Sequence, residues 1–133
     1  MNTIKQNTHL LASEKLVGSV VSIGEESATV KLKITKEMRV DEFSLAHGGF
    51  VFGLADYAAM VVINEPTVVL GKAEVKFLKP VAVNDELTAK ATKSSNIDGK
   101  KTTVLVEISN TKNEIVFEGK FVCFVLEEHV LKK

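Results

Sequence analysis

Asp56 is the residue of this sequence best placed to do chemistry, because it is a single carboxylate inside an apolar run from Phe50 to Ile63. If the run is a helix, the residues that share a face with Asp56 are Phe52, Gly53, Ala59 and Met60. A lone carboxylate among such neighbours costs free energy unless it is hydrogen-bonded or performs a task. The alternative interpretation is that this edge of the helix is wet and that Asp56 simply points to water.

Three residues before the apolar run, His47, Gly48 and Gly49, form a second candidate for chemistry. Glycine lets a ligand approach backbone N–H groups closely, and the first N–H groups of a helix carry partial positive charge. Such donors stabilise a carbonyl oxygen as it becomes an oxyanion. The simpler interpretation is a loop that turns sharply into a helix.

A helix over residues 47–64 must position both groups. The run contains Gly53 and several β-branched residues, which favour a strand. Its length decides for a helix, because it exceeds an ordinary strand and no turn residue interrupts it. Pro66 follows and predicts the helix stop, with Glu65 restricted before it.

Six other segments have the alternating or continuous apolar pattern of β-strands. The predicted strands are residues 16–23, 28–35, 67–78, 86–94, 101–109 and 114–126. The predicted turns are residues 24–27, 84–85, 98–99 and 110–113, and Pro80 predicts a bulge or a strand break. The remaining predictions are a loose start or short helix over 1–14, a connecting loop over 36–46 and a polar tail over 127–133.

This order of elements predicts an α+β domain in which one long helix lies against a curled antiparallel sheet. The helix is apolar on nearly all sides, which is more than one face of a sheet can cover. We therefore expect a second subunit to cover the rest.

Composition limits the classes of function. The 133 residues predict a single domain, and the 45% hydrophobic content fits a globular protein. Lys plus Arg equals Asp plus Glu at 17 each, which argues against nucleic acid as the main partner. The single cysteine, Cys123, favours a reducing compartment such as the cytoplasm, and its strand pattern favours core packing over a nucleophile. We expect neither a signal peptide nor a membrane span.

Two stretches carry a resemblance to a known family. The pattern His-Gly-Gly-Phe-Val-Phe-Gly-Leu-Ala-Asp-Tyr-Ala-Ala, from His47, resembles the hotdog-fold acyl-CoA thioesterases of the phenylacetic-acid-pathway (PaaI-like) group. So does the later stretch Val-Val-Leu-Gly-Lys-Ala-Glu-Val-Lys-Phe-Leu-Lys-Pro-Val, from Val68. The resemblance covers roughly residues 15–126. It implies a hotdog fold, in which a curved antiparallel sheet of about six strands wraps a central helix. The fold alone is weak evidence of function, because it also hosts dehydratases and regulators.

The resemblance also implies roles for four residues. Gly48 matches the glycine whose backbone N–H polarises the thioester carbonyl, and Asp56 matches the acid that acts as nucleophile or as base for water. His47 matches the histidine that shapes this end of the site. Asp41 stands where relatives usually carry Asn or Gln, and an ionised Asp accepts hydrogen bonds but donates none. The Asp at this position is the main departure from the family pattern, and we expect it to assist the reaction.

Substrate contacts are expected from residues near the two motifs, namely Gly49, Phe50, Gly71, Lys72, Lys79 and Pro80. Phe50 also suits core or dimer packing, as do Phe52, Tyr57 and Met60. The lysines at 90, 93, 100 and 101 are either a solvated face or contacts to coenzyme A phosphates. We expect no metal and no cofactor apart from the coenzyme A of the substrate, and the resemblance implies homodimers that often pair into homotetramers.

Helix geometry gives a separate reason to expect a dimer. Gly48 and Asp56 are eight positions apart, which separates their backbones by roughly 12 Å along a helix axis. General-base or nucleophilic work needs an approach of about 3 Å. One helix therefore cannot supply both groups to one carbonyl, whereas a symmetric dimer can join Gly48 of one chain to Asp56 of the other.

Two other functions stay open. A non-catalytic acyl-CoA-binding or sensing module would keep the pocket without turnover. An enoyl-CoA hydratase ranks below it, because Asp41 and His47 lack the Gly-Asp-x-Asn-Pro-x-His context of those enzymes. The sequence contains no Gly-x-Ser-x-Gly elbow, no metal-ligand spacing and no phosphate loop or dinucleotide fingerprint.

Overall fold

The computed structural model describes residues 3–96 and 100–132. Its helices are α1 (Glu14–Val17), the 3₁₀ turn η1 (Lys36–Met38) and α2 (Gly48–Ile63). Its strands are β1 (Ser19–Ile23), β2 (Ser27–Lys33), β3 (Val68–Phe77), β4 (Glu86–Asn96), β5 (Lys101–Ser109) and β6 (Ile115–Val125). The predicted Asp98–Gly99 turn lies outside the described residues.

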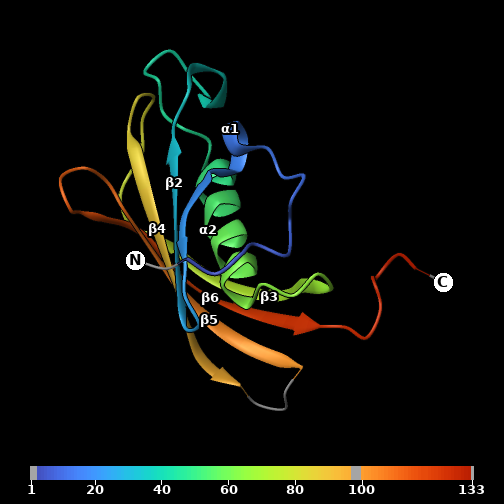
Figure 1. The fold of residues 1–133 in the computed structure, drawn as a ribbon. Helices are drawn as coiled ribbons and strands as arrows, with labels where there is room; N and C mark the ends of the chain where they lie inside the picture. Colours follow the sequence, from blue (N-terminus) through green and yellow to red (C-terminus); the bar gives the residue numbers. More distant parts are fainter. Residues whose placement is uncertain (1–2, 97–99, 133) are drawn as a thin grey trace.

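The six strands form one sheet in the order β1-β2-β4-β5-β6-β3, and every neighbouring pair is antiparallel. The sheet curves around α2, which lies in its hollow (Figure 1). This arrangement confirms the prediction of a hotdog fold, with one long helix wrapped by a curved antiparallel sheet. β3 follows α2 in the chain but lies at the far edge of the sheet, beside the last strand.

Helix α2 is capped at both ends by residues that the helix pattern did not identify as caps. His47 is the N-cap, and its side chain accepts a hydrogen bond from the Gly49 N–H. Asn64 takes a left-handed conformation with φ of 59° and ends the helix. The helix therefore spans 48–63 rather than 47–64, and Asn64 rather than Pro66 is its stop.

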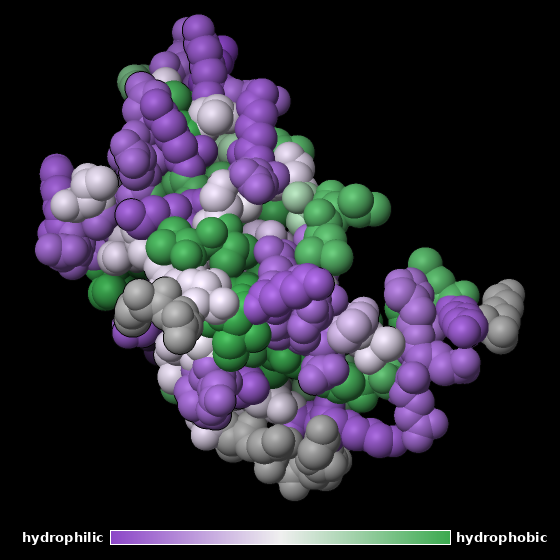
Figure 2. Space-filling view, viewed as in Figure 1, coloured by the Kyte–Doolittle hydropathy of each residue, from purple (hydrophilic) through white to green (hydrophobic). Residues whose placement is uncertain are grey.

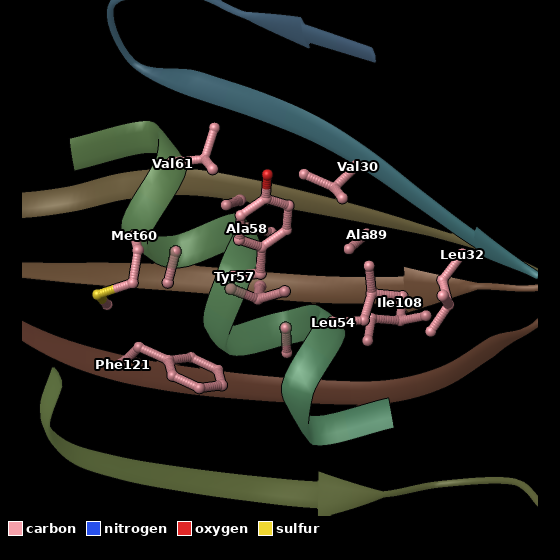
Figure 3. Close-up of a cluster of buried hydrophobic side chains, with 14 of the residues drawn as sticks. Val30, Leu32, Leu54, Tyr57, Ala58, Met60, Val61, Ala89, Ile108 and Phe121 are labelled. Carbon is pink, nitrogen blue, oxygen red and sulfur yellow. The ribbon is translucent and has the colours of Figure 1, made fainter. Parts of the chain in front are cut away.

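The core lies between α2 and the inner face of the sheet (Figure 3). Leu54, Ala58 and Val61 from the helix meet strand residues such as Val30 and Ile108, all of them 1% exposed or less. Alternation explains the strand side of this core, because every second residue of β2 and β5 is buried. The apolar patterns that predicted these strands are thus the patterns of their buried faces.

Further predictions outside the helix differ from the structure. Residues 16–18 are not part of the first strand, because Ser13 caps the single turn of α1 and Gly18, with φ of 117°, then reverses the chain into β1. The connection 36–46 is not wholly loop, because η1 buries Met38. The bulge in β3 falls between Leu70 and Lys72 and not at Pro80, which lies beyond the end of the strand at Phe77, as the alternative of a strand break predicted.

Both ends of the described chain carry exposed apolar side chains. Figure 2 shows hydrophobic groups projecting from the N-terminal segment and from the C-terminal tail. They include Leu11, which is fully exposed, and Leu131, which is 80% exposed. Within the described ranges, no helix is long and apolar enough to cross a membrane.

A pair of glycine substitutions tests the local geometry. A Cβ at Gly18 would lie 2.8 Å from Val30 and 2.9 Å from the Lys31 carbonyl, in a conformation that L-residues rarely adopt. We predict that Gly18→Ala lowers the free energy of unfolding by about 1–3 kcal/mol. Gly53→Ala is the control, since its Cβ would meet only Val17 at 3.9 Å. It should raise that free energy by about 0.5–1 kcal/mol. Equal effects in urea denaturation would contradict this account.

Candidate active site

The N-terminus of α2 presents an open backbone donor. His47 Nδ1 accepts the Gly49 N–H at 2.7 Å, so the cap uses the second amide of the helix. The Gly48 N–H has no acceptor among the residues that the structure describes. A Cβ at Gly49 would lie 2.8 Å from His47 Nδ1, so the absence of a side chain there makes this cap possible. The histidine thus caps the start of the helix through the contact of its ring with the Gly49 backbone.

Gly48 opens onto a pocket of about 230 Å³. Its wall brings together three predicted site residues, Gly48, Lys79 and Pro80. The rest of the lining is apolar: Leu45, Ala46, Val51, Phe77, Val81 and Val116. Pattern reasoning missed these apolar residues, although Phe77 could have been found from its position just before Lys79 and Pro80. The arrangement suits an apolar or polarisable group whose carbonyl meets the Gly48 N–H.

Lys79 and Phe77 shape this pocket in different ways. Lys79 Nζ lies 3.1 Å from Glu114 Oε2, and both side chains are substantially exposed. The ring of Phe77 is 55% exposed and lies 3.2 Å from the position that a Cβ on Gly48 would occupy. A glycine at 48 therefore keeps the space between the helix end and Phe77 open.

Asp56 lies two turns further along α2. It is the only charged residue of that helix, and its Oδ1 is buried without a hydrogen-bond partner in the described part of the chain. Burial raises the pKa of its carboxyl above the ordinary value. The side chain as a whole is half-buried, so its inner oxygen does not simply point to water. A carboxylate held in this way is a stronger base than an exposed one.

Cys123 lies in the core of β6, where it is 1% exposed. Its packing role was predicted, and its environment disfavours a nucleophile. Burial and the Asp56 carboxylate together raise the pKa of the Cys123 thiol to about 12. The thiol therefore stays protonated at neutral pH. The proximity of these two residues depends on how β6 packs against α2, which the alternation pattern does not reveal.

Asp41 organises the loop before the helix. Its Oδ1 accepts the N–H groups of Phe43 at 3.0 Å and Leu45 at 3.2 Å. These bonds shape a tight turn in which Ser44 has φ of 68°. The acceptor role needs an oxygen and no donor, so an Asp serves it as well as an Asn would. No contact joins Asp41 to Gly48 or Asp56 among the described residues.

The other predicted substrate residues are separate from the pocket at Gly48. Gly71 lies in the β3 bulge, where a Cβ would be 2.3 Å from the ring of Phe124, so its missing side chain makes room for that ring. Lys72 is exposed and pairs with Glu74 at 3.3 Å. Phe50 is half-buried and meets the ring of His47 edge-on at 6.1 Å. Within one chain, the structure does not bring these three to the pocket.

No group of three His, Cys, Asp or Glu side chains gathers as metal ligands would within residues 3–96 and 100–132. The described site offers a backbone donor, a half-buried carboxylate and an apolar pocket.

A family model described as "Thioesterase superfamily" matches residues 43–117, which include the helix, the pocket and Asp56. The chain belongs to the thioesterase superfamily. The matched range excludes the first two strands and ends within β6.

Two solved structures show the same hotdog fold. Protein PH1136 from Pyrococcus horikoshii is 55% identical, with a TM-score of 0.96 over 99% of this chain and 100% of that one. The PaaI protein of the Escherichia coli phenylacetic acid degradation operon is 25% identical, with a TM-score of 0.78 over 86% and 83% of the two chains.

Curated relatives are longer proteins. Transcription factor FapR from Caldanaerobacter subterraneus is 31% identical over 121 residues, which are 90% of this chain and 59% of FapR. A protein from Aquifex aeolicus named methylthioribose-1-phosphate isomerase is 48% identical over 114 residues, which are 86% of this chain and 25% of that protein. The chain thus spans less than two thirds of these relatives.

The contacts of Asp41 generate a prediction. Asp41→Ala should remove the acceptor of the Phe43 and Leu45 amides, so both should exchange hydrogen faster with solvent. Asp41→Asn keeps an oxygen at that position and should preserve their protection. Amide exchange followed by NMR measures both. Unchanged protection in Asp41→Ala, or lost protection in Asp41→Asn, would show that this carboxylate does not hold the turn.

Proposed function

We propose that the protein is an acyl-CoA thioesterase of the PaaI-like group that acts on a small acyl or aryl thioester. One observation carries the proposal: the same helix bears an unpaired N–H at an apolar pocket and a carboxylate whose buried oxygen has no partner among the described residues. The family model supports hydrolysis of thioesters as the reaction class.

In the proposed reaction Asp56 acts as the general base. Its carboxylate takes a proton from water while the water oxygen bonds to the thioester carbonyl carbon. The Gly48 N–H stabilises the resulting oxyanion. When the carbon–sulfur bond breaks, the carbonyl reforms and the thiolate of coenzyme A takes the proton from Asp56. The base must be ionised, and burial raises its pKa. As the pH is lowered, the rate should therefore begin to fall at a higher pH than it would with an ordinary Asp.

The open edge of β3 supplies a way to join the two groups. β3 is ten residues long, and β6 is its only hydrogen-bonded neighbour in the described sheet. Gly48 lies beside Phe77 at one end of β3, whereas Cys123, near Asp56, pairs with Leu70 towards the other end. If two β3 strands pair antiparallel about a two-fold axis, the Gly48 end of one chain meets the Asp56 end of the other. We propose a homodimer with two such composite sites, which pairs further into a tetramer.

A second candidate function is a non-catalytic acyl-CoA sensor. The similarity to FapR, which is named a transcription factor, favours it. A sensor would bind acyl-CoA without releasing thiol. Thiol-release assays on a panel of short, medium and aryl acyl-CoA substrates, beside calorimetric binding of the same compounds, separate turnover from binding alone.

Substitution of Asp56 tests its role. Asp56→Asn should lower turnover by about 10²–10⁴-fold, because the amide cannot take up the proton. The same change should raise the free energy of unfolding at neutral pH, since a buried charge is removed. Single turnover in ¹⁸O-water should place the label in the product acid. Label in Asp56 would show that it is the nucleophile instead, and wild-type turnover by a folded Asp56→Asn protein would remove Asp56 from the chemistry.

The donor can be removed at Gly48 with little change to the helix. Proline is well tolerated at the first helical position, and His47, with φ of −66° and ψ of 129°, already has the extended backbone that a residue before proline needs. Gly48→Pro should lower turnover by about 10²–10³-fold. Gly48→Ala is the control, because it adds the same Cβ against Phe77 and keeps the N–H.

The same variant tests the composite site. Mixed dimers of Gly48→Pro and Asp56→Ala chains contain one intact site, so subunit exchange between the two inactive proteins should restore activity. Verified mixed dimers without activity, or a stable monomer with full activity, would contradict the composite site.

A further inference from the structure

The face of α2 that carries Asp56 lies over β6. Phe52, one helical turn before Asp56, packs against Phe121 of β6 with ring centroids 5.6 Å apart. Figure 3 shows Phe121 on its strand beside the helix. Cys123 is two residues further along β6 than Phe121, so both side chains point to the same face of the sheet. Asp56 lies one turn along the helix from Phe52, and Cys123 lies two residues along the strand from Phe121, so we infer that Asp56 is above Cys123.

The thiol of Cys123 is turned to the backbone. Its Sγ donates to the carbonyl oxygen of Phe121 at a distance of 3.7 Å. A thiol is a weak donor, and this one has a carbonyl partner already. The neighbouring carboxylate oxygen Oδ1 of Asp56 is left without a donor within the described residues. The contribution of the Asp56 carboxylate to the raised pKa of the Cys123 thiol agrees with this placement.

The described strands packed against α2 place no buried charge near Asp56, and the N-terminal segment brings His9 to the helix, with its ring centroid 6.3 Å from that of Tyr57. The buried residues of β2, β4 and β5 are apolar apart from Thr102. The charged side chains of β3 nearest this end, Lys72 and Glu74, are exposed and pair with each other. In α1, Glu14 and Lys15 are exposed. Cys123 is therefore the titratable group that faces Asp56 from the described sheet.

We propose that Cys123 is a positioning residue for Asp56, in that its weakly polar thiol forms the wall beneath the buried Oδ1 and gives that oxygen no strong donor, so that the carboxylate keeps a high proton affinity when its other oxygen meets the attacking water. The inference rests on the proposed function for its catalytic meaning. Its physical reason is that a hydroxyl at this position, a stronger donor than a thiol, would bond to the carboxylate and favour its charged form. A thiol fills the same space without that bond.

Replacement of Cys123 by serine and alanine tests the proposal. Cys123→Ser should lower the pKa of Asp56 by about one unit, a tenfold change in proton affinity, and Cys123→Ala should leave it raised. The readout is ¹³C NMR of the Asp56 carboxyl, assigned with Asp56→Asn. Val122→Ser is the matched control, because it adds a hydroxyl to the neighbouring position on the opposite face of β6, and it should leave the Asp56 pKa unchanged.

Kinetics then connect the change in pKa to catalysis. With Cys123→Ser, the acid limb of the pH–rate profile should move to lower pH by the same amount, and the limiting rate should fall because the base is weaker. Cys123→Ala should keep the wild-type profile. An unchanged Asp56 pKa in Cys123→Ser, or an equal decrease in Cys123→Ala and Cys123→Ser, would overturn the proposal.

Wild-type protein provides a test that needs no substitution in β6. Cys123 is the only cysteine of the chain, so its infrared S–H stretching band is unambiguous. The band should shift as Asp56 titrates, and Asp56→Asn should abolish that shift. An S–H band whose frequency does not change as Asp56 titrates would overturn the proposed proximity. Neither spectroscopic readout depends on turnover, so a wild-type chain that hydrolyses no acyl-CoA would refute the proposed function and leave this inference to be judged by the spectra.

Discussion

Burial of one apolar helix in the hollow of a curved sheet is the constraint on which the rest of the structure depends. Ten of the sixteen residues of α2 are buried, and the strands contribute their inner faces to cover them. That packing removes water from the helix surface. Asp56 is carried into this environment by its neighbours in sequence, and its inner oxygen loses water without gaining a donor from the described chain. The hydrophobic free energy of the core thus supports a carboxylate that would not be stable there alone.

The helix also fixes the spacing between the two functional groups. An α-helix is a rigid element, so the rise along α2 holds the Gly48 amide and the Asp56 carboxylate apart whatever the loops do. The cap at His47 and the turn at Asp41 adjust only the first of these groups. In the proposed dimer, the edge strand β3 of the sheet determines which part of the partner chain approaches the second group. The position of the Gly48 amide therefore depends on local contacts at the helix start, and the surroundings of Asp56 depend on the strand order.

Much of the fold followed from the sequence because its patterns are patterns of burial. Alternation in β2 and β5 and the length of the α2 run both report which residues face the core. The errors arose where a single residue decides the conformation: Gly18 separates α1 from β1, and the left-handed Asn64 ends α2 before Pro66 can. Within the site, Lys79 and Pro80 lie beside Gly48 because a strand end meets the helix start there. Gly71, Lys72 and Cys123 depend on the register of β3 and β6, and pairing between distant strands leaves little trace in a single sequence.

The strand order has a consequence for how the molecule is made. β3 leaves α2 early in the chain, but its hydrogen-bonded neighbour in the described sheet is β6, which is synthesised last of the six strands. During synthesis β3 therefore has no ladder to join until β6 has left the ribosome, and the contacts between the two strands are far apart in sequence. The slowest step of folding should accordingly be the docking of β3, because this edge strand cannot take its final position in a nascent chain that still lacks β6.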